Sequence, residues 1–109
     1  MPQTVIYHVR PGSEHQLQAV LSETWQIYLK EGMVHADPHV LVKVREDETR
    51  DCFIEVFTWT GCFAMEHPSA TVQSQISKIE PLCEARKGSL AIEFRDTQMF
   101  APRLPKVAE

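Results

Sequence analysis

The order of strand-like and helix-like patterns along the chain is the feature that most limits its fold. Runs rich in β-branched and aromatic residues lie at 4–10, 39–46, 51–59 and 89–96. Apolar residues recur at three- and four-residue spacing from about 13 to 32 and again from about 70 to 86, as in amphipathic helices. The resulting order, β-α-β-β-α-β, predicts an α+β fold of the ferredoxin-like type, with two helices on one face of an antiparallel sheet.

Turn-forming residues support these boundaries. Pro11 and Gly12 end the first strand-like run, and Ser13 follows them as the predicted N-cap of the first helix. Pro81 lies inside the second helical pattern. Because proline removes a backbone donor and clashes with the preceding turn, we expect a kink or break there.

Length and charge bound the class of protein. A chain of 109 residues with 43% hydrophobic residues is one domain that can bury a core. We expect this domain to span residues 1–98, followed by a C-terminal arm at 99–109. The net charge of -4 and the absence of a basic run argue against nucleic acid as a partner. No apolar run approaches roughly 20 residues, the length of a membrane span, so we expect no membrane partner.

Neither the cysteines nor the loop before the second strand predicts a metal site. Cys52, Cys62 and Cys83 are odd in number and form no C-x-x-C pair, so we expect free thiols in a reducing cytoplasm. The loop at 33–40 offers two histidines and an aspartate as donors for a divalent metal. Their spacing fits no metal motif, and Asp37-Pro38 is an ordinary turn signal.

Strand alternation predicts which side chains share a face of the sheet. Val40, Val42 and Val44 share one side of the second strand, whereas the third strand carries aromatic residues on one side. We expect the helices to cover the aliphatic sides. The uncovered face would then carry Phe53, Phe57 and Trp59 among His8, His39, Lys43, Glu55, Glu93 and Arg95. An apolar patch of this kind predicts a homodimer whose sheets face each other and enclose a pocket.

The stretch IEVFTWTGCFAMEHPSATV, residues 54–72, resembles the antibiotic biosynthesis monooxygenase superfamily of dimeric α/β barrels. Members of that family carry an acidic residue on a strand, a Trp or acidic residue near its end, a small residue, and a His in the turn before a helix. Glu55, Trp59, Ala64 and His67 match these positions. The resemblance in element order covers residues 3–96.

This resemblance implies a cofactor-independent monooxygenase acting on a phenolic, quinol-like or polyketide-like molecule. Such an enzyme holds the substrate in an apolar pocket, removes a proton and stabilises the anion. The candidate catalytic residues are His67, Trp59 and His8, and the candidate substrate-binding residues are Phe53, Glu55, Phe57, His39 and Glu93. The haem-degrading branch of the family uses an Asn, and this chain contains none, so we expect no cofactor.

Each candidate also has a structural interpretation. Trp59 can fill an interface, and His67 can belong to a helix-entry turn because Pro68 follows it. Glu55 and Glu93 can form an ion network with the basic residues on the same predicted face. Trp25 and Tyr28, one helical turn apart, are typical of packing. The alternative function is a non-catalytic module that binds a small ligand or a partner on the same dimeric barrel.

Overall fold

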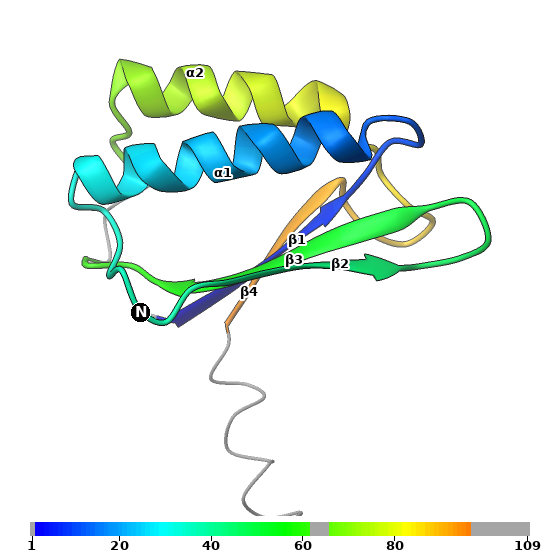
Figure 1. Cartoon of the computed structure of the whole chain (residues 1–109), viewed down its shortest axis with the longest axis horizontal. Helices are drawn as coiled ribbons and strands as arrows, with labels where there is room; N and C mark the ends of the chain where they lie inside the picture. The colour runs from blue at the N-terminus through cyan, green and yellow to red at the C-terminus, as the bar shows by residue number, and fades with distance from the viewer. Residues whose placement is uncertain (1, 62–65, 97–109) are drawn as a thin grey trace, which may run out of the picture.

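The computed structural model describes residues 2–61 and 66–96. Its elements are β1 (Pro2–His8), α1 (Glu14–Lys30), β2 (Val40–Arg45), β3 (Asp51–Thr58), α2 (Ala70–Ile79), a 3-10 turn η1 (Glu80–Leu82) and β4 (Ile92–Asp96). The four strands form one antiparallel sheet in the order β2-β3-β1-β4. Both helices lie on the same face of this sheet (Figure 1). The predicted α+β class is confirmed, and the arrangement is compatible with a ferredoxin-like fold.

The helices follow the apolar spacing of the sequence. Buried residues of α1 recur every three or four positions, at Leu17, Leu21, Thr24, Trp25 and Tyr28. Ser13 occupies the predicted N-cap position, but its side chain makes no capping bond. The helix α2 is capped instead by Ser69, whose hydroxyl accepts a hydrogen bond from the Val72 amide at 3.2 Å. The expected break at Pro81 is confirmed, because α2 ends at Ile79 and η1 follows it.

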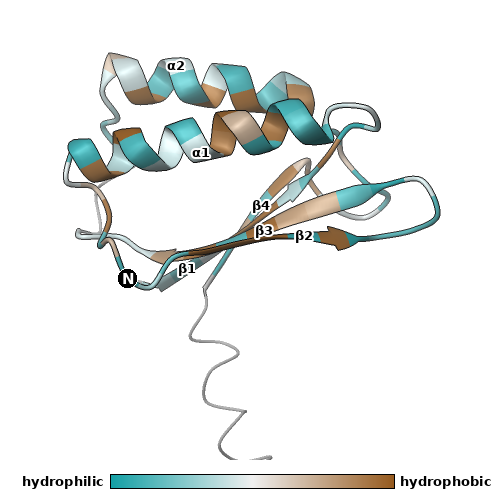
Figure 2. Cartoon of the chain, viewed as in Figure 1, coloured by the Kyte–Doolittle hydropathy of each residue, from teal (hydrophilic) through white to brown (hydrophobic). Residues whose placement is uncertain are grey.

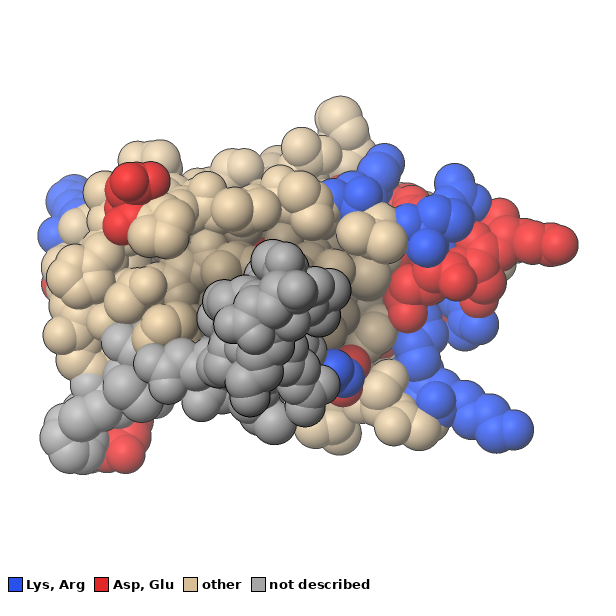
Figure 3. Space-filling view, turned by 90° about the horizontal axis from the view of Figure 1, so that it is seen from below, with Lys and Arg blue, Asp and Glu red and all other residues tan. Residues whose placement is uncertain are grey.

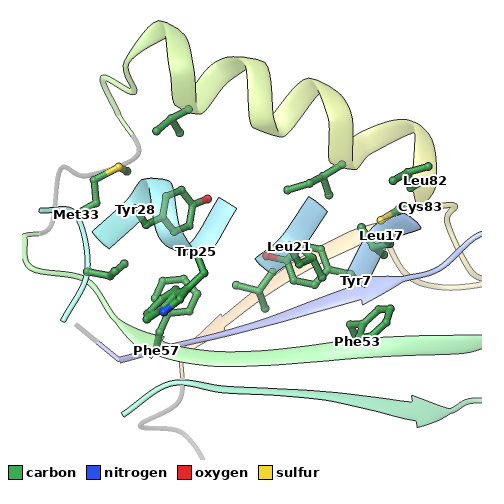
Figure 4. Close-up of a cluster of buried hydrophobic side chains, with 14 of the residues drawn as sticks. Tyr7, Leu17, Leu21, Trp25, Tyr28, Met33, Phe53, Phe57, Leu82 and Cys83 are labelled. Atoms are coloured by element: carbon green, nitrogen blue, oxygen red, sulfur yellow. The ribbon is translucent and has the colours of Figure 1, made fainter. Parts of the chain in front are cut away.

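The aromatic side of β3 faces the helices, so our assignment of Phe53, Glu55 and Phe57 to the uncovered face was wrong, whereas the register does place His8, Glu93 and Arg95 on that face. Phe53 and Phe57 are 2% and 1% exposed and belong to the core with Trp59. In Figure 4 both phenylalanines rise from β3 toward the helix layer. Alternation shows which side chains share a face of the sheet, but it does not show which of the two faces the helices cover. The large aromatic rings occupy the face under the helices because they fill the space between the two layers and remove more apolar area from water than valines do.

The opposite face of the sheet is aliphatic along β2 and the adjoining parts of β3 and β1, and it also carries His8, Glu93 and Arg95. Val40, Val42 and Val44 of β2 are 45%, 45% and 41% exposed. The strand register places them on the same face as the half-buried residues Ile54, Val56 and Ile6. We call these six residues the open face. Hydrophobic colouring runs along β2 and β3 in Figure 2, and in Figure 3 charged side chains gather mainly at one end of this side of the molecule.

Three expectations fall on parts of the chain that the structure leaves undescribed, and one of them is the free thiol of Cys62. Ala64, one of the residues behind the family resemblance, lies outside the described residues. The C-terminal arm predicted at 99–109 does so as well.

Candidate functional site

A cavity of about 280 Å³ lies between the helix layer and the β4 side of the sheet. Its walls come from β1, α1, α2, η1 and β4, through the residues Tyr7, Tyr28, Ile76, Ile79, Glu80, Ile92 and Phe94. We call it the Tyr7 cavity. Figure 4 shows Tyr7 and Tyr28 between the helices and the sheet. Its size is close to the lower bound of ordinary ligand pockets, about 300 Å³, and its lining is largely apolar and aromatic.

A buried carboxylate adjoins the cavity through Tyr7. Glu55 of β3 is 2% exposed, and its neighbours across the sheet on the same face, Val5 and Leu41, are both apolar. Its polar partners come from elsewhere. The Tyr7 hydroxyl donates to Glu55 Oε1 at 2.9 Å, and His39 Nε2 lies 2.9 Å from Oε2. Both carboxylate oxygens are therefore hydrogen-bonded, as a buried charge requires.

Burial has the largest effect on the pKa of Glu55. Removal from water raises the pKa of Glu55 above its usual value, and the hydrogen bonds from His39 and Tyr7 oppose that rise. Burial, reinforced by the charge of Glu55, raises the pKa of Tyr7 well above its ordinary range. The same two causes raise the pKa of Tyr28 to about 12. Both tyrosines are therefore neutral hydroxyls near neutral pH, and Glu55 is the group best suited to exchange a proton.

An aromatic stack fixes the orientation of His39. The rings of Trp25 and His39 lie parallel, with centroids 3.5 Å apart and an interplanar angle of 5°. Trp25 packs in turn edge-on against Phe57 at 5.7 Å. The His39 side chain is 21% exposed, so it lies between solvent and the buried Glu55. Stacking thus holds its Nε2 toward the carboxylate.

His8, a candidate catalytic residue, lies in a different place. It faces Glu46 through Nδ1 at 3.0 Å and Glu93 through Nε2 at 2.6 Å. The guanidinium of Arg86 also contacts Glu46 at 3.2 Å. The hydrogen bond from His8 is the main cause that lowers the pKa of Glu93, with a smaller contribution from Arg95. These side chains form a charged network in which both ring nitrogens of His8 are occupied.

The expected single network of Glu55, Glu93 and their basic neighbours is therefore wrong. Alternation along β3 and β4, combined with the register, places Glu55 on the helix side and Glu93 on the opposite side. Glu55 pairs with His39 and Tyr7, whereas Glu93 pairs with His8 and Arg95. The two carboxylates belong to separate sites.

The other candidates do not reach the cavity lining. His67 is exposed and precedes the α2 cap. Trp59 packs on Phe57 with ring centroids 4.7 Å apart, and its Nε1 donates to the Gln3 side chain at 3.1 Å. Of the five predicted substrate-binding residues, only Glu55 and His39 belong to the hydrogen-bonded chain that starts at Tyr7.

Sequence reasoning missed the aromatic residues of the site. The sequence pattern indicates a strand position for Tyr7 and packing roles for Tyr28 and Trp25, yet these residues line the cavity or orient His39. One sequence signal could have indicated them. Tyrosine and tryptophan carry a hydrogen-bonding group on an aromatic ring, and here they lie on the apolar faces of β1 and α1. The partner of Tyr7 depends on the β1–β3 register, which the sequence does not show.

The fold and the site define a small α+β domain with an apolar cavity beside a buried, hydrogen-bonded carboxylate. Comparison with known protein families, with curated proteins and with solved structures finds no match for this chain. Within residues 2–61 and 66–96, no three His, Cys, Asp or Glu side chains are grouped to hold a metal ion. In that same part of the chain, none of the helices has the length and apolarity to cross a membrane.

Proposed function

We propose that the chain is a cofactor-independent monooxygenase acting on a small phenolic, quinol-like or polyketide-like molecule bound in the Tyr7 cavity. The observation that carries this proposal is that Tyr7 both lines the cavity and donates its hydroxyl to the buried Glu55. An apolar cavity with a few converging polar groups and a carboxyl of raised pKa has the features of a site for proton chemistry on a flat apolar molecule.

The proposed reaction leaves the redox work to the substrate. Removal of a proton from an anthrone-type molecule gives an electron-rich enolate, which reacts with dioxygen as the co-reactant. The methylene carbon is oxidised to a carbonyl, one oxygen atom enters the product and the other leaves as water. Four electrons pass from the substrate to dioxygen, so the protein supplies only positioning and proton transfer.

The same cavity also supports the alternative function, a module that binds a small ligand without converting it. The apolar walls from Ile76, Ile79 and Ile92 favour binding of a flat ring whether or not chemistry follows. Binding without oxygen consumption is the outcome that would select this function.

The open face supports the proposal that the chain forms a homodimer. Three valines of β2 are exposed side by side, and half-buried aliphatic residues continue the surface onto β3 and β1. An uncharged aliphatic surface is best matched by another of the same kind, and a two-fold axis supplies one from a second copy. We also place the protein in a reducing cytoplasm, in keeping with the buried free thiols of Cys52 and Cys83.

Light scattering of two variants tests the dimer. Val42→Glu places a charge in the open face and is expected to give a folded monomer at micromolar concentration. Thr71→Glu adds the same charge at an exposed position on α2 and should leave the dimer intact. A wild-type protein that is already monomeric would contradict the proposal.

Oxygen uptake with anthrone tests the proposed enzyme. Uptake above the rate without protein is expected for wild type, and Ile76→Trp, which fills the cavity, should abolish it. Ser74→Trp adds the same ring at an exposed position of α2 and should retain activity. His67→Ala separates the two possible locations. If His67→Ala abolishes uptake while Ile76→Trp does not, the site lies at the turn before α2 and the cavity assignment is wrong.

A further inference from the structure

Tyr7 connects the cavity to the buried carboxylate of Glu55. Its side chain lines the cavity, and its hydroxyl proton points at Glu55 Oε1 across 2.9 Å. Because that proton is already committed to Glu55, the lone pairs of the Tyr7 oxygen are left to accept a hydrogen bond from a bound molecule. A ligand whose acidic hydrogen meets the Tyr7 oxygen would have one hydroxyl between it and Glu55.

Three polar or titratable groups surround Glu55. Tyr7 of β1 and His39 before β2 are hydrogen-bonded to it, and Tyr28 of α1 is close enough for its pKa to be raised by the Glu55 charge. Glu80 of η1 lines the same cavity as the two tyrosines. The Glu55 carboxyl is nearly inaccessible to water, so a proton held there exchanges with solvent by way of His39, which lies 2.9 Å from Oε2 and has a side chain that is 21% exposed. These surroundings are those of a site that holds a proton between two steps of a reaction.

We propose that Tyr7 and Glu55 together form an internal proton store for the cavity. The hydrogen of a bound enol, phenol or activated C–H passes to the Tyr7 oxygen while the Tyr7 proton passes to Glu55 Oε1. The products are the substrate anion, a neutral tyrosine and a neutral carboxyl, so the total charge does not change. The reverse transfer returns the proton to a later anionic intermediate. The proposal rests on the ligand site proposed above and assigns its substrate as a weak acid.

His39 and Trp25 act as positioning residues for the store. His39 donates to the second oxygen of Glu55, and its ring is held by the parallel Trp25 ring. A hydrogen bond to the charged form lowers the pKa of a carboxyl, so His39 opposes the larger effect of burial and lowers the pH at which Glu55 can accept a proton. In this scheme Tyr7 is the residue that touches the substrate.

Anaerobic hydrogen exchange tests the store without any oxygen chemistry. The methylene hydrogens of anthrone are followed by proton NMR in D2O under nitrogen, with and without protein. Wild type is expected to accelerate their replacement by deuterium. Tyr7→Phe and Glu55→Gln should each lose about 100-fold or more of this acceleration, the range of a general base. Glu48→Gln, the same change at an exposed glutamate between β2 and β3, should behave like wild type.

The pH profile separates a proton role from a structural one. In the folded variant His39→Gln, the midpoint of the exchange rate should move to higher pH, because Glu55 loses a donor that stabilises its charge. A wild type that fails to accelerate exchange, or a Tyr7→Phe protein that matches wild type, would overturn the store. If wild type accelerates exchange but shows no aerobic oxygen uptake, the monooxygenase proposal is contradicted and the proton store is supported. If wild type takes up oxygen but Tyr7→Phe exchanges hydrogen as fast as wild type, the proton store is contradicted and the monooxygenase proposal is supported.

Discussion

The stability of Tyr7→Phe should depend on pH in a way that reveals the buried Tyr7–Glu55 pair. The substitution keeps the ring in the core and removes only the hydroxyl that donates to Glu55 at 2.9 Å. A hydrogen bond to a charged group contributes about 1.5–3 kcal/mol, and one between neutral groups about 0.5–1.5 kcal/mol. We therefore expect a loss of about 2 kcal/mol when Glu55 is ionised and about 1 kcal/mol when it is protonated.

The sign of the pH dependence follows from the direction of the Glu55 pKa shift. Burial raises the pKa of Glu55 in the folded protein, so its contribution to stability is fully present below the unfolded pKa, about 4.3, and is lost as pH rises through the folded pKa. Removing the Tyr7 donor raises the folded pKa further. The stability difference between wild type and Tyr7→Phe should therefore grow as pH rises through the folded pKa of wild-type Glu55, which lies above the unfolded value.

Urea denaturation at a series of pH values between 4 and 8 measures this difference. Tyr28→Phe is the matched control, because it makes the same change at the wall of the same cavity without removing a hydrogen bond to Glu55. Its cost should stay constant with pH. A cost of Tyr7→Phe that is equal at both ends of the series would refute the reasoning, as would the same pH dependence in Tyr28→Phe.

Two further changes test the packing and the charged network. Phe57→Ala removes a fully buried ring that contacts three other aromatic rings and should cost about 3–5 kcal/mol in urea denaturation, whereas Val44→Ala on the open face should cost far less in a monomeric background. The pKa of Glu93 is lower in the folded than in the unfolded protein. Ionised Glu93 therefore stabilises the fold above its unfolded pKa, and this contribution is lost as pH falls through its folded pKa. Glu93→Gln should therefore lose less stability than wild type on acidification from pH 6 to 3, and an equal loss would contradict this assignment.

The order and type of the elements were predictable from the sequence because they depend on local signals. The three- and four-residue spacing placed the buried residues of α1, and the backbone chemistry of Pro81 placed the end of α2. The strands were found at nearly the right positions, although β4 begins at Ile92, three residues later than expected. These features require no knowledge of distant contacts.

The candidate site was harder to predict because it depends on faces and registers. The alternation in β3 grouped Phe53, Glu55 and Phe57 correctly, but nothing local shows that this group faces the helices. The Tyr7–Glu55 bond joins residues 48 positions apart, and it exists because β1 and β3 are neighbours in one particular register. Glu55 and His39 are recognisable as candidates from the sequence because of their chemistry. Tyr7, which links them to the cavity, is not recognisable in this way.

The most direct test of the account asks where a small aromatic ligand binds. Isotope-filtered NMR of the protein with 1-naphthol detects contacts between ring protons of the ligand and methyl groups of the protein. The account predicts contacts to the methyl groups of Ile76, Ile79 and Ile92, which line the Tyr7 cavity. Contacts to Val40, Val42 and Val44 of the open face in their place, or no contacts at all, would contradict it.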